Sequence, residues 1–541
     1  MDIKKALFPY IPTPALHIYQ RIKRSLSPKT RNYSKTGNNI AHGEIIPLDL
    51  VLIKKEGIDS VKIIQYLEWD NPFNCNDFGR YQYQETYYKL CGETELPIEF
   101  SGYGLWTIEI HYCCKGKTFY KEKKTIKVEA PVYNIAYLSA TLPVVLFLLD
   151  MWEISKENSP TIISLERNLF DYNKLPPNVY PFPLANKMEL NTPYKGFNTY
   201  FQRMVFYIGS LYRMNPDAKF NLYLCDHFAY LVLCFLYANK IPEENFHVFL
   251  LSDGIGSYEC FNYIFKRNNA IKIYGKMKKT WKKSKRIAFQ TGVQNRGKEK
   301  FLRCGNPCMS KTIRSKSETI KFSYGFSFAY VLAAENKNIE WLLHNPKLLN
   351  GNKEILSFLE DSRIRKIDFN KKIKALESNR DELARLLGIN CSIFEKSKSE
   401  NKKVCVILGS ALWSLESEKY INATIEYFGD DYDYYFKGHP RHPFNPQKKQ
   451  MLVEKGIHIL DSKIPTEFYM MINPDIYLAG YLSSAFLSIE LLRNPSEQVL
   501  SIWDGKECKI KTNCFDFNAK TAMYIENGSV VIVTNDERVL A

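Results

Sequence analysis

The residues that could do chemistry gather at the ends of short apolar segments. Ser252-Asp253-Gly254 directly follows the apolar segment Phe246–Leu251. A carboxylate that a glycine turn holds at the end of a strand points into the adjacent cleft and can serve as a general base. The alternative is an ordinary Asp-Gly turn, which is common in proteins. Asp253 is therefore a candidate base, and support for this role has to come from the other candidate residues.

A histidine stands in a comparable place further along the chain. Residues 435–441, Tyr-Phe-Lys-Gly-His-Pro-Arg, run from an apolar segment into a stiff turn. An imidazole at such a turn can donate a hydrogen bond to a leaving phosphate, and the flanking cations add positive charge. The alternative, a surface turn histidine, does not account for those cations. The tract predicts an anion site that contains Lys437, Gly438, His439 and Pro440.

Two further strand ends complete the set. Gly409-Ser410 ends the apolar segment that begins at Lys403, and its backbone amides could meet a phosphate or a sugar. Ser483-Ser484 opens a predicted helix, where free amides and hydroxyls favour an anion. The alternative is that one of these serines only caps the helix, but a cap and a phosphate ligand use the same geometry.

These residues need two α/β units to position them. From Tyr133 onward, short apolar segments alternate with helical stretches, and residues 325–388 read as helical. The alternation begins again at Lys403. Such alternation predicts parallel sheets in βαβ units, with ligands bound where the carboxyl ends of the strands face a cleft. The expected fold is α/β, with two Rossmann-like domains at residues 131–400, which include a basic surface insertion at 270–320, and 401–541.

The first part of the chain has a different texture. Residues 45–130 contain short alternating strands separated by turn signals, which predicts a small all-β sandwich. Residues 1–44 read as a basic tail. Within it, Ala15–Leu26 could form an amphipathic helix that rests on anionic lipid at a membrane surface, and the alternative is a disordered tail. The longest apolar run, Ile135–Leu149, is shorter than the ~20 residues that span a bilayer, so we expect a buried core segment.

The composition and motifs of the chain limit which partners and cofactors are expected. The 541 residues carry a net charge of +16, but no recognisable nucleic-acid-binding motif accompanies it, so nucleic acid is not an expected partner. The 13 cysteines are scattered and no signal peptide is visible, which favours reduced thiols in the cytoplasm. Cys304 and Cys308 lack a second pair at zinc-site spacing, and Asp431-Tyr-Asp433 precedes a strand in an acidic turn. We therefore expect no metal, and no dinucleotide or Walker fingerprint indicates a cofactor.

Together these tracts resemble a known family. Gly409-Ser-Ala-Leu-Trp413, the tract around His439, Ile464-Pro-Thr-Glu467-Phe and Ser483-Ser484-Ala-Phe-Leu-Ser488 are similar to motifs of bacterial sialyltransferases of glycosyltransferase family 80, the Pasteurella–Photobacterium type, and occur in the same order. Ile255-Gly-Ser-Tyr258 is more similar to the lipooligosaccharide and polysialic-acid sialyltransferases. Some members carry an N-terminal immunoglobulin-like sandwich, which matches residues 45–130.

The resemblance implies an inverting, metal-independent transfer of sialic acid. CMP-sialic acid would be the donor, and a galactose-terminated glycan or glycolipid, such as lipooligosaccharide or capsule, the acceptor. The implied fold is the GT-B type. The enzyme would be cytoplasmic, or peripheral on the inner face of the inner membrane.

The implied roles divide the candidate residues between catalysis and the two substrates. Asp253 would be the general base and His439 the acid that assists departure of CMP. The residues implied to bind the donor are Gly409, Ser410, Lys437, Gly438, Pro440, Glu467, Ser483 and Ser484. Trp413 and His227 would bind the acceptor.

Two other functions stay open on the sequence. One is a two-Rossmann transferase for another nucleotide-activated donor, or a glycerol-phosphate polymerase. The other is a glycan-binding protein whose transferase core is inactive, which the intact Asp253, His439 and Glu467 disfavour.

Overall fold

A computed structural model describes most of the chain. The described residues are 31–34, 45–49, 57–67, 81–92, 95–100, 102–138, 140–155, 159–165, 171, 174–182, 197–226, 229–291, 328–361, 363–368, 378–409, 418–439, 446–473, 475–480, 483–486, 499–502, 521–526 and 529–534. The predicted lipid-binding helix Ala15–Leu26 lies outside them.

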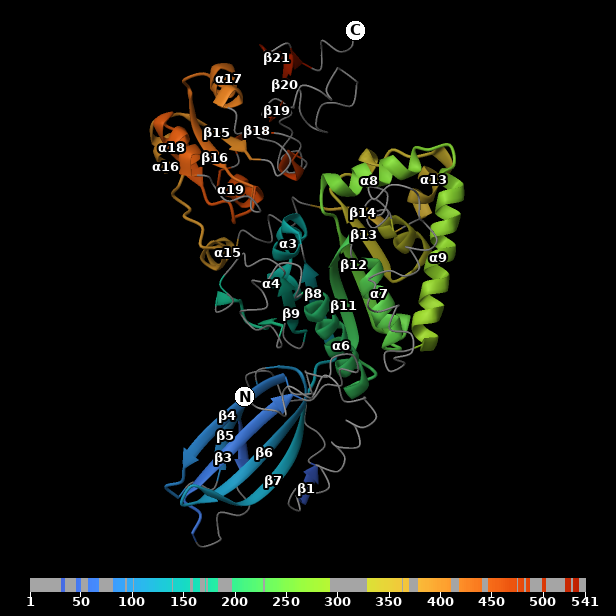
Figure 1. Cartoon of the computed structure of the whole chain (residues 1–541), viewed down its shortest axis with the longest axis vertical. Coiled ribbons are helices and arrows are strands. Elements are labelled where there is room, and N and C mark those ends of the chain that lie inside the picture. Colours follow the sequence, from blue (N-terminus) through green and yellow to red (C-terminus); the bar gives the residue numbers. More distant parts are fainter. Residues whose placement is uncertain are drawn as a thin grey trace, which may run out of the picture.

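The N-terminal part of the chain is built from strands (Figure 1). Five strands form a sheet in the order β1-β7-β6-β3-β4 and two more form a ribbon. Their bounds are β1 Arg31–Ser34, β2 Ile45–Asp49, β3 Ser60–Leu67, β4 Tyr81–Lys89, β5 Glu95–Glu99, β6 Gly104–Cys114 and β7 Lys117–Val128. The pairing is antiparallel except that β1 runs parallel to β7, so residues 31–34 of the expected tail form an edge strand. The immunoglobulin-like topology stays a prediction.

The middle of the chain forms a parallel sheet of seven strands in the order β10-β9-β8-β11-β12-β13-β14. The strands are β8 Val132–Leu138, β9 Thr161–Leu165, β10 Val179–Pro181, β11 Lys219–Cys225, β12 Phe246–Leu251, β13 Ile339–Leu343 and β14 Ile364–Lys366. Six of them follow the doubly wound order 3-2-1-4-5-6 of a Rossmann fold. Its switch point lies between β8 and β11.

The C-terminal part repeats this arrangement. Its seven strands run in the order β17-β16-β15-β18-β19-β20-β21, and only the last pair is antiparallel. The strands are β15 Lys403–Leu408, β16 Tyr432–Lys437, β17 His458–Leu460, β18 Tyr477–Gly480, β19 Val499–Ile502, β20 Thr521–Glu526 and β21 Ser529–Thr534. The expectation of two Rossmann-like parallel sheets is confirmed. The second switch point lies between β15 and β18.

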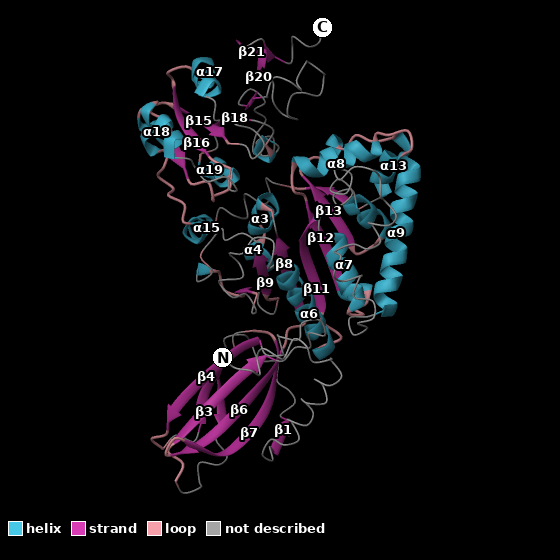
Figure 2. Ribbon diagram, in the orientation of Figure 1, coloured by secondary structure: helices cyan, strands magenta, loops and turns pink. Residues whose placement is uncertain are grey.

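Helices flank both sheets (Figure 2). The described helices are α3 Thr141–Leu148, α4 Met151–Ile154, α6 Phe197–Met214, α7 Ala229–Ala238, η4 Glu243–Asn245, α8 Ile255–Phe265, α9 Ala270–Thr291, η6 Pro346–Leu348, α13 Lys353–Asp361, α15 Arg380–Leu387, α16 Glu395–Ser399, α17 Glu418–Phe428, α18 Pro446–Glu454 and α19 Thr466–Ile472.

The region 325–388 is not wholly helical, and that prediction was wrong. It contains strands β13 and β14. The segment Ile339-Glu-Trp-Leu-Leu343 is a five-residue apolar run, and periodicity alone cannot separate so short a buried strand from part of a helix. β14 has only three residues, too few to show any period.

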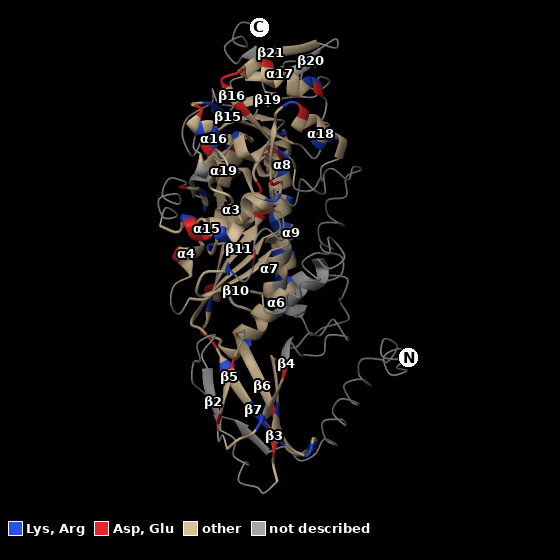
Figure 3. Ribbon diagram, turned by 90° about the vertical axis from the view of Figure 1, so that its left-hand side faces the viewer, with Lys and Arg blue, Asp and Glu red and all other residues tan. Residues whose placement is uncertain are grey.

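The basic insertion begins as a packed helix. In α9, Met277 and Trp281 are buried in the core, whereas Lys276, Lys279 and Lys283 are exposed on the outer side. The ribbon of this helix is blue in Figure 3 where it carries Lys and Arg. The lysines therefore coat an amphipathic helix, whose apolar stripe fixes it to the domain.

One hydrophobic core joins the two Rossmann-like sheets. The predicted core segment Ile135–Leu149 forms β8 and α3 and is buried, apart from the partly exposed Thr141 and Ser139, which lies outside the described residues. Leu142 and Val145 of α3 share a core with Leu478 of the second sheet. Helix α6 contacts the N-terminal β part, where its Tyr207 hydroxyl donates to the carbonyl of Tyr103, the residue before β6, at 2.9 Å. Among the described helices, none combines the length and apolar character needed to cross a membrane.

Candidate active site

The chemical residues of the first half lie at the carboxyl edge of its sheet. Asp226 follows β11, the Ser252-Asp253 pair follows β12, and His344 follows β13. Because neighbouring parallel strands end at the same edge, these residues share one side of the sheet. Asp253 is partly exposed, whereas Asp226 and Ser252 have no exposed surface.

The second half presents its candidates in the same way. Gly409 follows β15, His439 lies two residues beyond β16, and Ser483 lies three residues beyond β18. The Gly409 N–H donates to the Lys437 carbonyl at 2.8 Å. A Cβ at Gly409 would lie 3.1 Å from the backbone nitrogen of His439, so a side chain there would press on the histidine turn. Glycine at 409 lets the two strand ends approach closely, while His439 stays partly exposed.

A hydrogen bond joins the two edges. The N–H of Ile255, at the start of α8, donates to Ser484 Oγ at 3.3 Å, across 229 residues of sequence. Gly254 has a φ of +86°, and a Cβ there would lie 2.0 Å from the same hydroxyl oxygen. The turn that carries Asp253 thus lies against the paired serines. This contact brings a predicted base and a predicted phosphate ligand to one place.

The two serines make different hydrogen bonds. Ser483 Oγ accepts from the N–H of Ala485 at 3.3 Å, which is the geometry of a helix cap. Ser484 Oγ instead faces the first half of the chain. Both serines are partly exposed.

Lys437 lies in a buried ionic cluster. Its side chain is 6% exposed, and its ammonium donates to the Ser462 carbonyl at 3.4 Å. Burial lowers the pKa of Lys437 to about 8, and the carboxylates of Glu467 and Asp461 partly oppose that shift. Glu467 is itself only 5% exposed. Lys437 and Glu467 therefore interact electrostatically beneath the histidine turn, a relation that their spacing in sequence does not reveal.

Sequence reasoning missed a buried carboxyl group beneath the Asp253 turn. Asp226 Oδ2 accepts from Ser257 Oγ at 2.5 Å and from Trp341 Nε1 at 3.1 Å. Burial raises the pKa of Asp226 to about 7, and the nearby Asp253 carboxylate adds to the rise, while hydrogen bonds from Ser257, Trp341 and the Asp253 backbone oppose it. The only signal in the sequence is an acidic residue directly after an apolar strand.

Four predicted site residues lie outside the described residues: Ser410, Pro440, Trp413 and His227. Within the part of the chain that the structure describes, no three His, Cys, Asp or Glu side chains are grouped as metal ligands.

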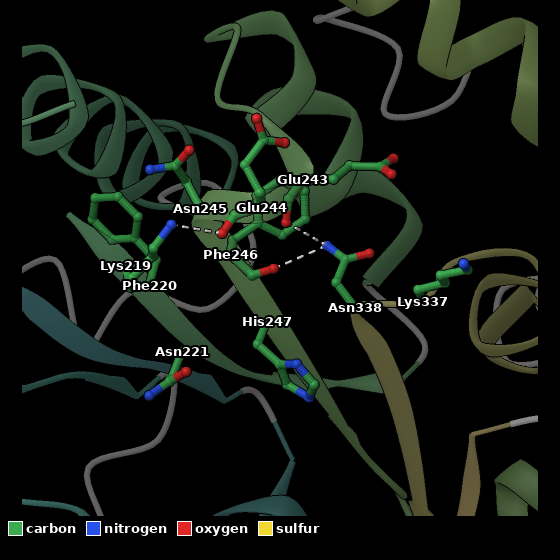
Figure 4. A pocket seen from close by; sticks show the side chains of 10 residues that line it. All are labelled: Lys219, Phe220, Asn221, Glu243, Glu244, Asn245, Phe246, His247, Lys337 and Asn338. Atoms are coloured by element: carbon green, nitrogen blue, oxygen red, sulfur yellow. Dashed lines mark hydrogen bonds between the residues drawn. The ribbon is translucent and has the colours of Figure 1, made fainter. Parts of the chain in front are cut away.

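A pocket of about 460 Å³ lies at the opposite end of the first sheet (Figure 4). It is lined by the amino ends of β11 and β12 and by Lys337 and Asn338. Several of its donors are already engaged: Lys219 Nζ donates to the Glu244 carbonyl at 3.0 Å, and Asn338 Nδ2 donates to the Phe246 carbonyl at 2.9 Å. None of the predicted site residues lines this pocket.

Solved structures with a related arrangement include sialyltransferases. A 2,6-sialyltransferase from a Photobacterium species, crystallised with CMP and lactose, is 14% identical, with a TM-score of 0.49 over 89% of this chain and 91% of that one. A sialyltransferase from Photobacterium damsela gives 14% and 0.49 over 89% and 93%. Os79 from O. sativa, crystallised with UDP, gives 11% and 0.37 over 69% and 80%. None of the curated proteins is significantly similar in sequence.

Two Rossmann-like domains touch at the carboxyl edges of their sheets, where the described candidate residues lie. The family model described as alpha-2,8-polysialyltransferase matches residues 222–499, just over half of the 541 residues. The chain belongs to this family, and it is a sialyltransferase that depends on CMP-sialic acid. The matched region contains every described candidate, from Asp226 to Ser484.

Proposed function

We propose that the chain transfers sialic acid from CMP-sialic acid to a hydroxyl of a galactose-containing glycan, with inversion and without a metal ion. The observation that carries the proposal is the contact between the Asp253 turn and Ser484. It brings the turn that carries Asp253 against Ser484, one of the two serines that we assign to the phosphate. A sugar hydroxyl and a phosphate leaving group need these two kinds of neighbour.

The bonds formed and broken follow from these roles. Asp253 accepts the proton of the acceptor hydroxyl, and the acceptor oxygen forms a bond to the anomeric carbon of sialic acid. The bond from that carbon to the phosphate oxygen breaks, and CMP leaves. His439 donates to the departing phosphate, with Ser483 and Ser484 as further donors. The transition state is oxocarbenium-like, as in glycoside hydrolysis, so stabilising the leaving group is the main task.

The remaining donor contacts follow the same plan. Glu467 holds the ribose hydroxyls, while Lys437, beside it, adds positive charge below the phosphate. We assign Gly409, Ser410, Gly438 and Pro440 to binding of the nucleotide, and Trp413 and His227 to binding of the acceptor.

The acceptor is a sugar chain that ends in galactose or in sialic acid. Lactose is bound in one structure of similar arrangement, whereas the family description refers to α2,8-linked polysialic acid. A lipooligosaccharide or capsule chain can end in galactose or in sialic acid. The basic N-terminal segment would hold the enzyme on the inner face of the membrane, where lipid-linked acceptors lie.

The test is a transfer assay with CMP-sialic acid and either lactose or an α2,8-linked sialic acid oligomer. Sialylated product and released CMP are measured with and without excess EDTA, and sialidases determine the linkage. Asp253→Asn and His439→Ala should each lower kcat at least ~100-fold. Matched controls are Asp431→Asn and His458→Ala, which alter exposed residues away from the two strand edges. Full activity in Asp253→Asn or His439→Ala would refute the catalytic role of that residue. Tighter binding of UDP than of CMP would favour another donor.

A further inference from the structure

A buried network of hydrogen bonds lies directly beneath the Asp253 turn. Asp226, at the end of β11, has no exposed surface. Its Oδ2 accepts from Ser257 of α8 at 2.5 Å and from the indole N–H of Trp341 on β13 at 3.1 Å. Because an indole nitrogen can only donate, this oxygen of Asp226 is fixed as an acceptor.

Ser257 links Asp226 to the turn that carries Asp253. Its Oγ accepts from the Asp253 N–H at 3.2 Å and from the Ser252 hydroxyl at 3.2 Å. A hydroxyl has one proton to donate and two lone pairs to accept with. Because Ser257 donates its hydroxyl proton to Asp226, both lone pairs of Ser257 Oγ can accept from the turn. The Ser257 hydroxyl thus makes all three of its possible hydrogen bonds.

The turn itself continues the same chain of bonds. Ser252 Oγ accepts from the Gly254 N–H at 3.1 Å, so the residues on both sides of Asp253 are held by side-chain hydroxyls. The bond between Asp253 and Ser257 comes from the backbone N–H of Asp253, and Asp253 as a whole is partly exposed.

We propose that Asp226 is a positioning residue, which acts through Ser257 to hold the backbone of Asp253 so that the Asp253 carboxylate meets the acceptor hydroxyl. This inference rests on the proposed function of Asp253 as the general base. Asp226 itself does not touch substrate, because it is fully buried. Burying a carboxyl group is costly, as the raised pKa of Asp226 shows, and such a cost is typical of functional sites.

The experiment compares Asp226→Asn, Ser257→Ala and Ser257→Thr with the matched control Ser284→Ala. Ser284 is also a fully buried serine of the same domain, and its hydroxyl bonds to Tyr230 at 2.5 Å. Asp226→Asn and Ser257→Ala should lower kcat for sialyl transfer about 10- to 100-fold, because small displacements of a catalytic group cost this much. CMP affinity and the acceptor KM should stay within about twofold of wild type.

The conservative and double variants separate positioning from simple loss of packing. Ser257→Thr keeps the hydroxyl and should retain most of the activity, whereas Ser284→Ala should lose stability without a selective loss of kcat. The double variant Asp226→Asn with Ser257→Ala should be no slower than Ser257→Ala alone, since both act along one path. Wild-type kcat in Asp226→Asn, or an equal loss in Ser284→Ala, would overturn the proposal.

A second readout does not depend on the reaction. Amide hydrogen exchange of the peptide that contains Asp253 should speed up in Asp226→Asn and in Ser257→Ala, but not in Ser284→Ala. Faster exchange in a chain that transfers no sialic acid would support the positioning role while refuting the proposed function. Unchanged exchange together with unchanged kcat would refute the positioning role while leaving the proposed function intact.

Discussion

Replacing Gly254 by alanine tests how closely the two halves of the site must approach. Gly254 has φ +86° and ψ −134°, a conformation that is essentially restricted to glycine. An added Cβ would lie 2.0 Å from Ser484 Oγ, 2.6 Å from Ser484 Cβ and 3.1 Å from Leu142 Cδ2. The substitution therefore combines backbone strain with a clash across the contact between the two sheets.

The magnitude follows from these two terms. Strain at such a position costs about 1–3 kcal/mol, and overpacking costs about 1–3 kcal/mol more, so we expect a loss of about 2–6 kcal/mol. If the contact opens instead, the separation must grow by about 1.4 Å, the step from 2.0 Å to the 3.4 Å of ordinary contact. A displacement of this size should lower kcat/KM for sialyl transfer about 100-fold.

Gly388→Ala is the matched control for this variant. Gly388 also has a positive φ, +66°, at the end of α15, but nothing lies within 4 Å of a Cβ added there. It should cost only the strain of about 1–2 kcal/mol and leave transfer unchanged. Ser484→Gly should partly restore the stability of Gly254→Ala by removing both nearest atoms. Urea unfolding and initial rates measure both effects, and equal losses in the two alanine variants would refute the reasoning.

Three further predictions concern protons and metals. The pKa of Asp226 is raised from 3.8 to about 7, so the native state loses stability as pH rises from about 4 to 7; Asp226→Asn should gain stability relative to wild type over that window in thermal unfolding. Burial lowers the pKa of His344 to about 3, so the native state loses stability as pH falls from 6.5 toward 3; His344→Gln should show a flatter acid limb. Sialyl transfer should persist in excess EDTA, as measured by initial rates.

Each of these has an outcome that contradicts it. Parallel stability profiles of Asp226→Asn and wild type would show that Asp226 ionises normally in the fold. An unchanged acid limb in His344→Gln would mean that His344 is protonated in the native state. Loss of transfer in EDTA, with recovery on adding Mg²⁺, would contradict the metal-independent mechanism.

Much of the second half could be predicted from sequence because its strands are short, apolar and bounded by turns. The run beginning at Lys403 is β15, and the aromatic run before His439 is β16. Strands β13 and β14 were missed because three to five residues carry too little pattern to outweigh the helical segments around them.

The candidate site could be predicted only in part. Strand-end positions of Asp253, His439 and Ser484 followed from local sequence, because a turn after an apolar strand exposes the next polar side chain. The sequence analysis selected His227 and not the preceding Asp226, because the local sequence does not distinguish a buried carboxyl group from an exposed one. Its burial depends on Trp341, which lies 115 residues away.

By itself, the sequence determined which residues stand at the carboxyl ends of strands, since hydrophobic runs and glycine turns act over a few residues. Only the tertiary structure decided which of those ends meet. The bond between Ile255 and Ser484 spans 229 residues, and the desolvation that lowers the pKa of Lys437 comes from the packing of separate segments around it. Contacts and desolvation of this kind are properties of the packed chain, and they convert separate turns into one site.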